Sequence, residues 1–326
     1  MHPILFEISG WGPINAYGTL ILLGGLMAMP GLYWELKSRG LGSGRTGTML
    51  LDLYLVLIFG AAVGGRVLHI LTAPGPYLDD PSRIVSPDVT GFVFFGSMLA
   101  IIGGFYWIAR RYGTTFAQVC DSGATWMPLG HTLGRMGCLM AGCCWGAPTQ
   151  VPWSLRFGPA SVAYGAGEVP RLGDHTVPLH PTQIYEGAGL LALFAVLLVI
   201  RRRRGIEPPW RQGSRYLLGY GLLRFGVEIF RGDPSRGLLL ELRASTLAGW
   251  LGLPPDQPLL LSVSQAIALA MVAVGVWGLR RTTSPPATEP MTPSAAPPGD
   301  DRDRARPATP PPQTPASTDP DVLGRP

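Results

Sequence analysis

Long apolar stretches alternate with short polar connections over most of this chain. Stretches of about 18 to 24 apolar residues are long enough to cross the hydrocarbon core of a bilayer as helices. They lie at residues 13–34, 49–72, 91–109, 116–141, 183–200, 214–230 and 259–279. The pattern predicts an all-α, polytopic membrane protein with about seven transmembrane helices. The stretches at 116–141 and 214–230 fit this pattern least well, because both contain arginine.

The pattern of apolar stretches ends near residue 281. From residue 282 onward the chain is rich in proline, threonine, alanine, serine and aspartate, and it has no apolar periodicity. Such a composition is typical of disorder. We therefore expect a membrane domain at residues 1–281 and a disordered cytoplasmic tail at residues 282–326.

The connections between the apolar stretches differ in positive charge. Those after the first, third and fifth stretches are the richer ones, with Lys37, Arg39, Arg45, Arg110, Arg111, Arg201 to Arg204, Arg211 and Arg215. Because arginine and lysine accumulate on the cytoplasmic side, we expect the N-terminus outside and the C-terminus inside. No lysine or arginine precedes the first stretch, which argues against a cleavable signal peptide.

Composition supports the membrane interpretation. Hydrophobic residues make up 47% of the 326 residues, charged residues only 14%, and the mean hydropathy is +0.24. The net charge of +5 comes mainly from arginines between apolar stretches, as in the run at 201–204. These are expected orientation charges, so we predict membrane lipids as partners and no nucleic acid.

All four cysteines lie in one region of the sequence, at Cys120, Cys138, Cys143 and Cys144. No Cys-x-x-Cys pair is present, and a long chain with few cysteines is a poor candidate for a disulfide scaffold. We favour small-residue packing in a membrane helix and predict no metal site. A membrane thiol redox protein that uses Cys143 and Cys144 is an alternative.

Polar residues precede the fifth apolar stretch. His180, Gln183 and Glu186 follow one another at three-residue spacing, and Pro181 between them suits the first turn of a helix. Ionisable groups at the start of a membrane helix cost free energy when they lie within the bilayer, and they therefore indicate function. Tyr185 belongs to the same segment.

Further polar residues should reach the same outer half of the bilayer. His131 and Arg135 lie one turn apart in the fourth stretch; Arg224, Glu228 and Arg231 are spaced i, i+4, i+7 in the sixth. Tyr17 begins the first helix. Three arginines exceed two carboxylates, which favours an anionic ligand such as a lipid phosphate.

A purely structural role is the alternative for each of these residues. Arg224 and Glu228 can form an internal salt bridge, Arg231 can anchor a helix end at the interface, and Tyr17 can belong to an interfacial aromatic belt. The convergence of many such residues at one level favours a functional site.

Five motifs, in order over residues 10 to 280, resemble prolipoprotein diacylglyceryl transferase. They are Tyr17-Gly18, the segments at 134–137, 180–186 and 224–233, and the segment at 261–265. The resemblance implies a seven-helix enzyme of the bacterial inner membrane, with its site in the outer half. This enzyme moves the diacylglyceryl group of phosphatidylglycerol to the lipobox cysteine of a prolipoprotein, forming a thioether and releasing glycerol phosphate. No cofactor is implied.

The resemblance also implies roles for individual residues. It implies that Arg135 contacts the phospholipid, with Arg224, Glu228 and Tyr17 in or beside the site and His180 near it. We assign phospholipid binding to Arg135, Arg224, Arg231 and Tyr17, and a catalytic role to Glu228. The thiol must lose its proton to attack, so either His180 or His131 would be the base, with Tyr185 orienting it. A non-catalytic lipid-binding or transport relative on the same scaffold is the alternative function.

Two segments depart from the family pattern. Cys138 and Ala141, with Gly142 or Cys143, stand where the family usually has Asn, Asn and Glu. Phe95-Gly96-Ser97 replaces the usual His-Gly-Gly. The histidine of that segment has been favoured as a base in the family, and this role has no counterpart at Phe95. The chain resembles a divergent, cysteine-rich branch.

Overall fold

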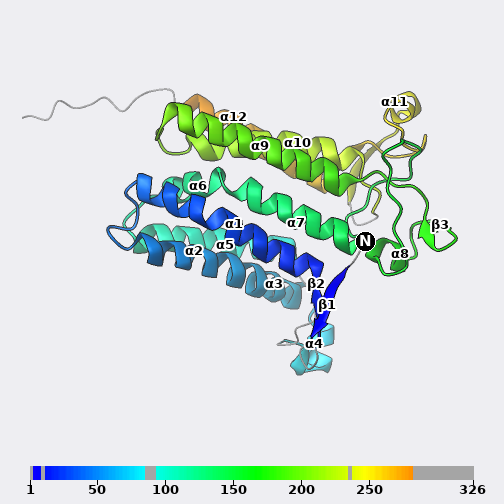
Figure 1. Ribbon diagram of the computed structural model, residues 1–326, viewed down its shortest axis with the longest axis horizontal. Helices are drawn as coiled ribbons and strands as arrows, with labels where there is room; N and C mark the ends of the chain where they lie inside the picture. Colours follow the sequence, from blue (N-terminus) through cyan, green and yellow to red (C-terminus); the bar gives the residue numbers. More distant parts are fainter. Residues whose placement is uncertain (1–2, 9–11, 85–92, 234–236, 282–326) are drawn as a thin grey trace, which may run out of the picture. The chain divides into compact units, whose positions relative to one another are not determined.

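The computed structural model describes residues 3–8, 12–84, 93–233 and 237–281. They belong to one compact unit, Met1–Ser284, which is mostly helical (Figure 1). The predicted tail lies outside the described residues, so the domain boundary after residue 281 stays a prediction.

Helices occupy all seven predicted positions. They are α1 (Ala16–Ser38), α2 (Thr46–Phe59) with η1 (Gly60–Gly64) and α3 (Gly65–Thr72), α5 (Phe94–Arg111), α6 (Phe116–Ala124) with α7 (Met127–Ala141), α9 (Thr182–Arg204), α10 (Arg211–Ile229) and α12 (Val263–Arg281). Within the described residues, four continuous spans are long and apolar enough to cross a membrane: Ala16–Ser38, Thr46–Thr72, Thr182–Arg204 and Val263–Arg281. The chain is thus a helical protein with membrane character.

The fourth predicted helix is interrupted. A capping box of Thr115 and Gln118 starts α6, and Pro128 in the first turn of α7 marks a new helix start. Because α7 begins afresh, its polar residues lie on a separate 15-residue helix.

Glycines bring the central helices together. A Cβ at Gly24 of α1 would lie 2.7 Å from the Gly130 carbonyl oxygen of α7, and one at Gly221 of α10 would lie 2.8 Å from the Ala268 carbonyl oxygen of α12. Small residues permit such close approach of helix backbones. α7 lies against α1 and α9, and α10 lies against α9 and α12.

Short elements gather at one end of this unit (Figure 1). They include the antiparallel pairs β1 (Ile4–Ile8) with β2 (Gly12–Asn15), β3 (Arg171–Leu172) with β4 (His175–Thr176) and β5 (Leu238–Leu242) with β6 (Leu260–Ser262). This group of short elements also includes the helices α4 (Gly75–Asp79), α8 (Val162–Gly165) and α11 (Ser245–Trp250) and the 3-10 turn η2 (Pro81–Ile84). The register of the first pair sets Ile8 opposite Gly12.

The arginine-rich connections lie at the opposite end, where α1, α9 and α12 finish (Figure 1). Glu35 of α1 is fully buried there. It accepts hydrogen bonds from Arg201 Nε at 2.8 Å and from Arg39 Nε at 2.7 Å. A buried carboxylate with two guanidinium partners is well compensated. The network therefore fixes α1 to α9.

Candidate functional site

Glu186 of α9 is the centre of an ion cluster in the helical bundle. Its side chain is only 1% exposed, and Oε1 lies 2.9 Å from Arg135 Nη2 of α7. The other carboxylate oxygen lies 3.4 Å from Arg224 Nη1 of α10. One carboxylate therefore links three helices.

A second carboxylate extends the cluster. Arg224 Nη2 lies 2.7 Å from Oε2 of Glu228, one turn later on α10. Ser262 Oγ donates to Glu228 Oε1 at 3.0 Å, and Arg224 Nη2 donates to Ser264 Oγ at 3.3 Å. The end of β6 and the start of α12 thus take part.

His131 and Tyr220 complete the ion cluster, defined here as His131, Arg135, Glu186, Tyr220, Arg224 and Glu228. His131 Nε2 lies 4.0 Å from Glu186 Oε1, and the Tyr220 hydroxyl donates to the same oxygen at 3.3 Å. The side chain of His131 is 29% exposed, so it is the most accessible of the cluster's charged or basic groups. Tyr220 was not predicted from the sequence, although its spacing of i−4 from Arg224 could have indicated it.

Arg135 has an unused donor. Its Nε is buried and has no hydrogen-bond partner among the described residues. A buried N–H without a partner costs free energy unless a ligand satisfies it. Arg135 can therefore bind an acceptor with Nε while Nη2 contacts Glu186.

The sequence expectation for Arg231 needs correction. α10 ends at Ile229, so Arg231 leaves the helical face of Arg224 and Glu228 and pairs with Asp233. Arg135, Arg224 and Arg231 are then matched by three carboxylates, Glu186, Glu228 and Asp233. Once Asp233 is counted, the excess of arginine over carboxylate that favoured an anionic ligand is gone, so such a ligand needs a different argument.

His180 and Tyr185 form a separate group where α9 begins. His180 Nδ1 lies 3.1 Å from the Tyr185 hydroxyl, and Nε2 lies 3.2 Å from the Gly252 carbonyl oxygen. The Trp153 indole N–H donates to the Tyr185 oxygen at 2.6 Å. The predicted proximity of His180 to Glu186 is not observed, because His180 precedes the helix and turns toward the loop at Gly252.

Both nitrogens of His180 thus have partners, and its side chain is 1% exposed. Burial lowers the pKa of His180 below its ordinary value of 6.5, and the hydrogen bond to Gly252 opposes this shift in part. The neutral imidazole therefore donates from Nε2 and accepts at Nδ1.

Tyr17, at the start of α1, lies beside α7 and outside the hydrogen bonds of the ion cluster. A Cβ at Gly137 would lie 3.1 Å from the Tyr17 carbonyl oxygen, so these two backbones touch. Tyr17 therefore lies beside the last part of α7. The side chain of Tyr17 is 43% exposed.

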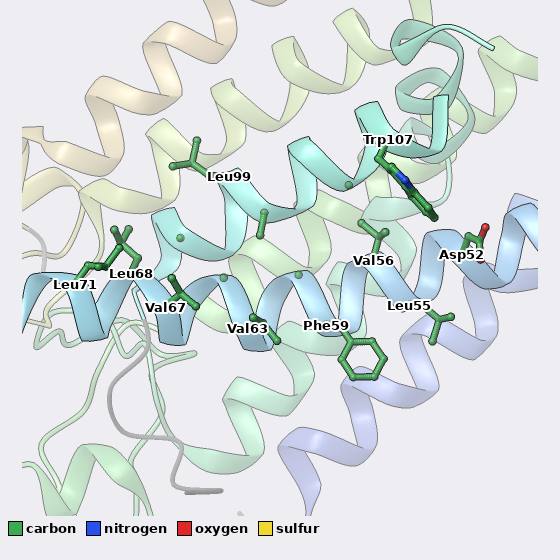
Figure 2. Close-up of a pocket in the computed structure, with 15 residues that line it drawn as sticks. Asp52, Leu55, Val56, Phe59, Val63, Val67, Leu68, Leu71, Leu99 and Trp107 are labelled. Atoms are coloured by element: carbon green, nitrogen blue, oxygen red, sulfur yellow. The ribbon is translucent and has the colours of Figure 1, made fainter. Parts of the chain in front are cut away.

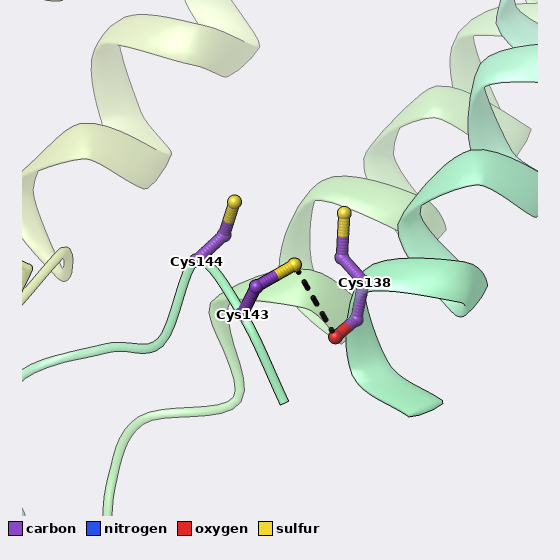
Figure 3. Close-up of side chains that lie close together, drawn as sticks. All are labelled: Cys138, Cys143 and Cys144. Carbon is purple, nitrogen blue, oxygen red and sulfur yellow. Dashed lines mark hydrogen bonds between the residues drawn. The ribbon is translucent and has the colours of Figure 1, made fainter. Parts of the chain in front are cut away.

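Cys138, Cys143 and Cys144 come together at the end of α7 (Figure 3). Their Sγ atoms all lie within 4.8 Å of one another. The sequence spacing did not predict this convergence, because it depends on how the chain reverses after α7.

An apolar groove lies elsewhere, between α2, η1 and α3 on one side and α5 on the other (Figure 2). It has a volume of about 720 Å³ and is lined by residues such as Phe59, Val63, Val67, Leu99 and Trp107. None of its lining residues belongs to the ion cluster. Such a groove suits hydrocarbon chains, and Asp52 is the one charged residue among the described residues of its lining.

The position of Phe95 also lies apart from the ion cluster. Phe95 is on α5, which packs against α2, η1 and α3. The neighbouring Ser97 Oγ donates to the Ala61 carbonyl oxygen at 2.6 Å. This segment thus joins α5 to η1.

The arrangement can be compared with known proteins. The family model described as prolipoprotein diacylglyceryl transferase matches residues 3–281. A relative from Vibrio atlanticus is 31% identical over 292 residues, covering 86% of this chain and 92% of the relative. One from Idiomarina loihiensis is 33% identical over 260 residues, covering 78% and 89%.

A third relative, from Clostridium tetani, is 30% identical over 280 residues, covering 85% of this chain and 96% of its own length. All three are named phosphatidylglycerol–prolipoprotein diacylglyceryl transferase. The family match contains every residue of the ion cluster and the cysteine group. The chain therefore belongs to the prolipoprotein diacylglyceryl transferase family.

Proposed function

We propose that this chain transfers the diacylglyceryl group of phosphatidylglycerol to the lipobox cysteine of a prolipoprotein. The family match and the names of the relatives support this activity. They give no support to a non-catalytic lipid-binding role. The products are a thioether-linked lipoprotein precursor and glycerol phosphate.

The observation that carries the proposal is the unused Nε donor of Arg135 within the ion cluster. Guanidinium groups bind phosphate oxygens through two parallel hydrogen bonds. A lipid phosphate that enters the cluster can take Nε of Arg135 first and then displace Glu186 from Nη2. Arg224 is the second cation within reach, since it shares the Glu186 carboxylate.

The reaction is a nucleophilic displacement at the glycerol carbon that bears the phosphate. The cysteine sulfur forms a bond to this carbon, the carbon–oxygen bond breaks, and its electron pair stays on the phosphate oxygen. Arg135 and Arg224 stabilise the charge that grows on the leaving phosphate. Glu186 keeps both guanidinium groups aimed at one point.

His131 is the base that we favour. It is part of the ion cluster and partly exposed, so it can accept the thiol proton. His180 uses both ring nitrogens in contacts with Tyr185 and Gly252, which suits an anchor for the outer loops. Glu228, Arg231 and Tyr17 would hold the site and the head group.

The two ends of the bundle support a proposal for localisation. Arginine-rich connections at one end favour a cytoplasmic position, and the short elements at the other end then lie outside. We propose a multi-pass protein of the bacterial inner membrane with seven spans, its site in the outer half and its N-terminus outside.

The test is thioether formation by the full-length protein in bilayer discs. A lipobox peptide incubated with phosphatidylglycerol should gain the mass of one diacylglyceryl group, and glycerol phosphate should appear in equal amount. A peptide with serine in place of cysteine is the control. Folded protein that binds phosphatidylglycerol and leaves the peptide unmodified would contradict the proposal.

A further inference from the structure

Three thiols converge where α7 ends. Cys138 lies in the last turn of the helix, and Gly142 follows it with a φ of 69°, which reverses the chain direction. The backbone N–H of Cys143 then donates to the Cys138 carbonyl oxygen at 3.1 Å. This helix end folds Cys143 and Cys144 back toward Cys138, and all three sulfur atoms lie within 4.8 Å of one another (Figure 3).

Side chains of α9 hold this turn in place. Thr182 Oγ1 donates to the Cys144 carbonyl oxygen at 2.8 Å, and Gln183 Nε2 donates to the Cys143 carbonyl oxygen at 2.7 Å. Cys144 itself has a φ of 57°, a left-handed conformation that is unfavourable for a non-glycine residue. The surrounding contacts therefore fix a strained backbone that brings the third sulfur to the group.

The spacing fits a metal ion. A zinc ion bound to three thiolates at about 2.3 Å, with tetrahedral angles, separates the sulfur atoms by about 3.8 Å. The observed limit of 4.8 Å requires only small side-chain rotations to reach this value. Two of the three residues, Cys143 and Cys144, are partly exposed.

Two arginines lie near the three cysteines. Zinc with three thiolates carries one net negative charge, and these arginines come from α7 and from the segment after α10. Arg135 lies one turn before Cys138 on α7, and Arg231 pairs with Gly146 through a backbone bridge. Both guanidinium groups also pair with carboxylates, Arg135 with Glu186 and Arg231 with Asp233, so the complex would lie beside ion pairs.

We propose that Cys138, Cys143 and Cys144 bind a zinc ion through three thiolates, and that its fourth position takes the thiol of the incoming lipobox cysteine. Three protein ligands with one open position are typical of catalytic zinc sites, and a coordinated thiol is deprotonated. This inference rests on the transferase activity proposed above.

The chemistry balances without oxidation or reduction. The lipobox thiol binds zinc and gives its proton to His131. The zinc-bound sulfur then forms its bond to the glycerol carbon, and the carbon–oxygen bond to phosphate breaks with its electron pair on oxygen. His131, Arg135 and Cys138 are spaced i, i+4, i+7 on α7, so base, phosphate ligand and metal ligand share one helical face.

The first test is the metal content of full-length protein purified under reducing conditions. We expect about one zinc per chain, lost in Cys138→Ser, Cys143→Ser and Cys144→Ser and retained in Cys120→Ser. Cys120 is the matched control, because it lies on α6 outside the group. Treatment of the wild-type protein with a chelator gives the same answer without a substitution that could disturb folding.

The second test uses cobalt in place of zinc. Its sulfur-to-metal absorption band should gain intensity when a lipobox peptide is added, and should not change with the serine peptide. Transferase activity should fall at least tenfold after chelation and return when zinc is added.

A wild-type protein without metal, with three free thiols or a disulfide among them, overturns the zinc site. If that protein forms the thioether at full rate, the transferase proposal stands and only the zinc inference fails. Bound metal with no spectral response to the cysteine peptide overturns the fourth-position role.

Discussion

At the scale of single residues, the ion cluster balances its charges because some side chains pair with two partners of opposite charge. Glu186 serves two arginines, and Arg224 serves two carboxylates. Such an arrangement is electrically neutral as a set, yet each member has more than one possible partner. A phosphate can therefore replace a carboxylate without leaving a guanidinium unpaired.

Glu186→Gln tests this sharing. The change leaves Arg135 and Arg224 with Glu228 as the remaining carboxylate, and the loss of one partner from a buried ion pair typically destabilises by about 3–5 kcal/mol. We expect a lower melting temperature, which phosphatidylglycerol should raise more than it does in the wild type because its phosphate supplies the missing charge.

Glu241→Gln is the control for this experiment. Glu241 is exposed and pairs with Arg243 at the surface, so its loss should change stability by less than about 0.5 kcal/mol. Equal effects of phosphatidylglycerol on the melting temperature of both variants would contradict the idea that phosphate substitutes for Glu186.

The burial of His180 leads us to expect that the stability of the protein depends on pH. The pKa of His180 in the folded protein lies below the ordinary 6.5 because of burial, so the stability it contributes is present above about pH 6.5. That contribution is lost as the pH falls through the lower folded-state value. We expect the melting temperature to fall between pH 7 and pH 5, and to fall less in His180→Gln.

His175→Gln is the matched control, since His175 is exposed. It should retain the wild-type decline of melting temperature with pH. A decline in His180→Gln as steep as that in the wild type would show that another group titrates.

At the scale of elements, the position of α7 decides the site. This helix carries His131, Arg135 and Cys138, and it approaches α1 closely at Gly24. A Cβ at Gly24 would meet the Gly130 carbonyl oxygen at 2.7 Å and Leu133 Cβ at 3.1 Å. Contact between the two backbones therefore sets where the polar face of α7 lies.

Gly24→Ala should push α7 away from α1. Overpacking of this kind costs about 1–3 kcal/mol, and displacement of Arg135 should lower transferase activity as well. Gly18→Ala on the same helix is the control, because a Cβ there meets nothing within 4 Å. Equal melting temperatures of Gly24→Ala and Gly18→Ala would contradict this prediction.

The apolar pattern predicted where the helices lie, because length and hydropathy depend on local sequence. Spacing on one helix likewise predicted the Arg224–Glu228 pair and the shared face of His131 and Arg135. The contacts that the sequence pattern did not predict depend on the direction that the chain takes after a helix ends. Arg231 and the three cysteines lie at such ends, where one left-handed residue or a following carboxylate decides the contacts.

At the scale of the whole molecule, the two ends of the bundle differ in chemistry. One end holds the arginine-rich turns and the buried Glu35 network, and the other holds the short strands and loops near His180 (Figure 1). In the topology that we propose, the second end lies outside the cytoplasm. The orientation predicted from charge is the basis of that proposal.

Single cysteines can report this orientation in intact cells. A membrane-impermeant maleimide should label Glu168→Cys more strongly than wild-type protein, because residue 168 is exposed near α8. Arg203→Cys, exposed at the end of α9, should react only after the membrane is opened. Labelling of Arg203→Cys above the wild-type level in intact cells would contradict the proposed topology.

The central claim is that Arg135 binds the lipid phosphate and stabilises it as it leaves. The most direct test is kcat/KM for diacylglyceryl transfer by Arg135→Gln beside Arg243→Gln, which removes an exposed arginine. We predict a loss of about 10²–10³ in Arg135→Gln, the usual effect of removing one group that stabilises a developing oxyanion, and wild-type activity in Arg243→Gln. Unchanged kcat/KM in folded Arg135→Gln would contradict the account.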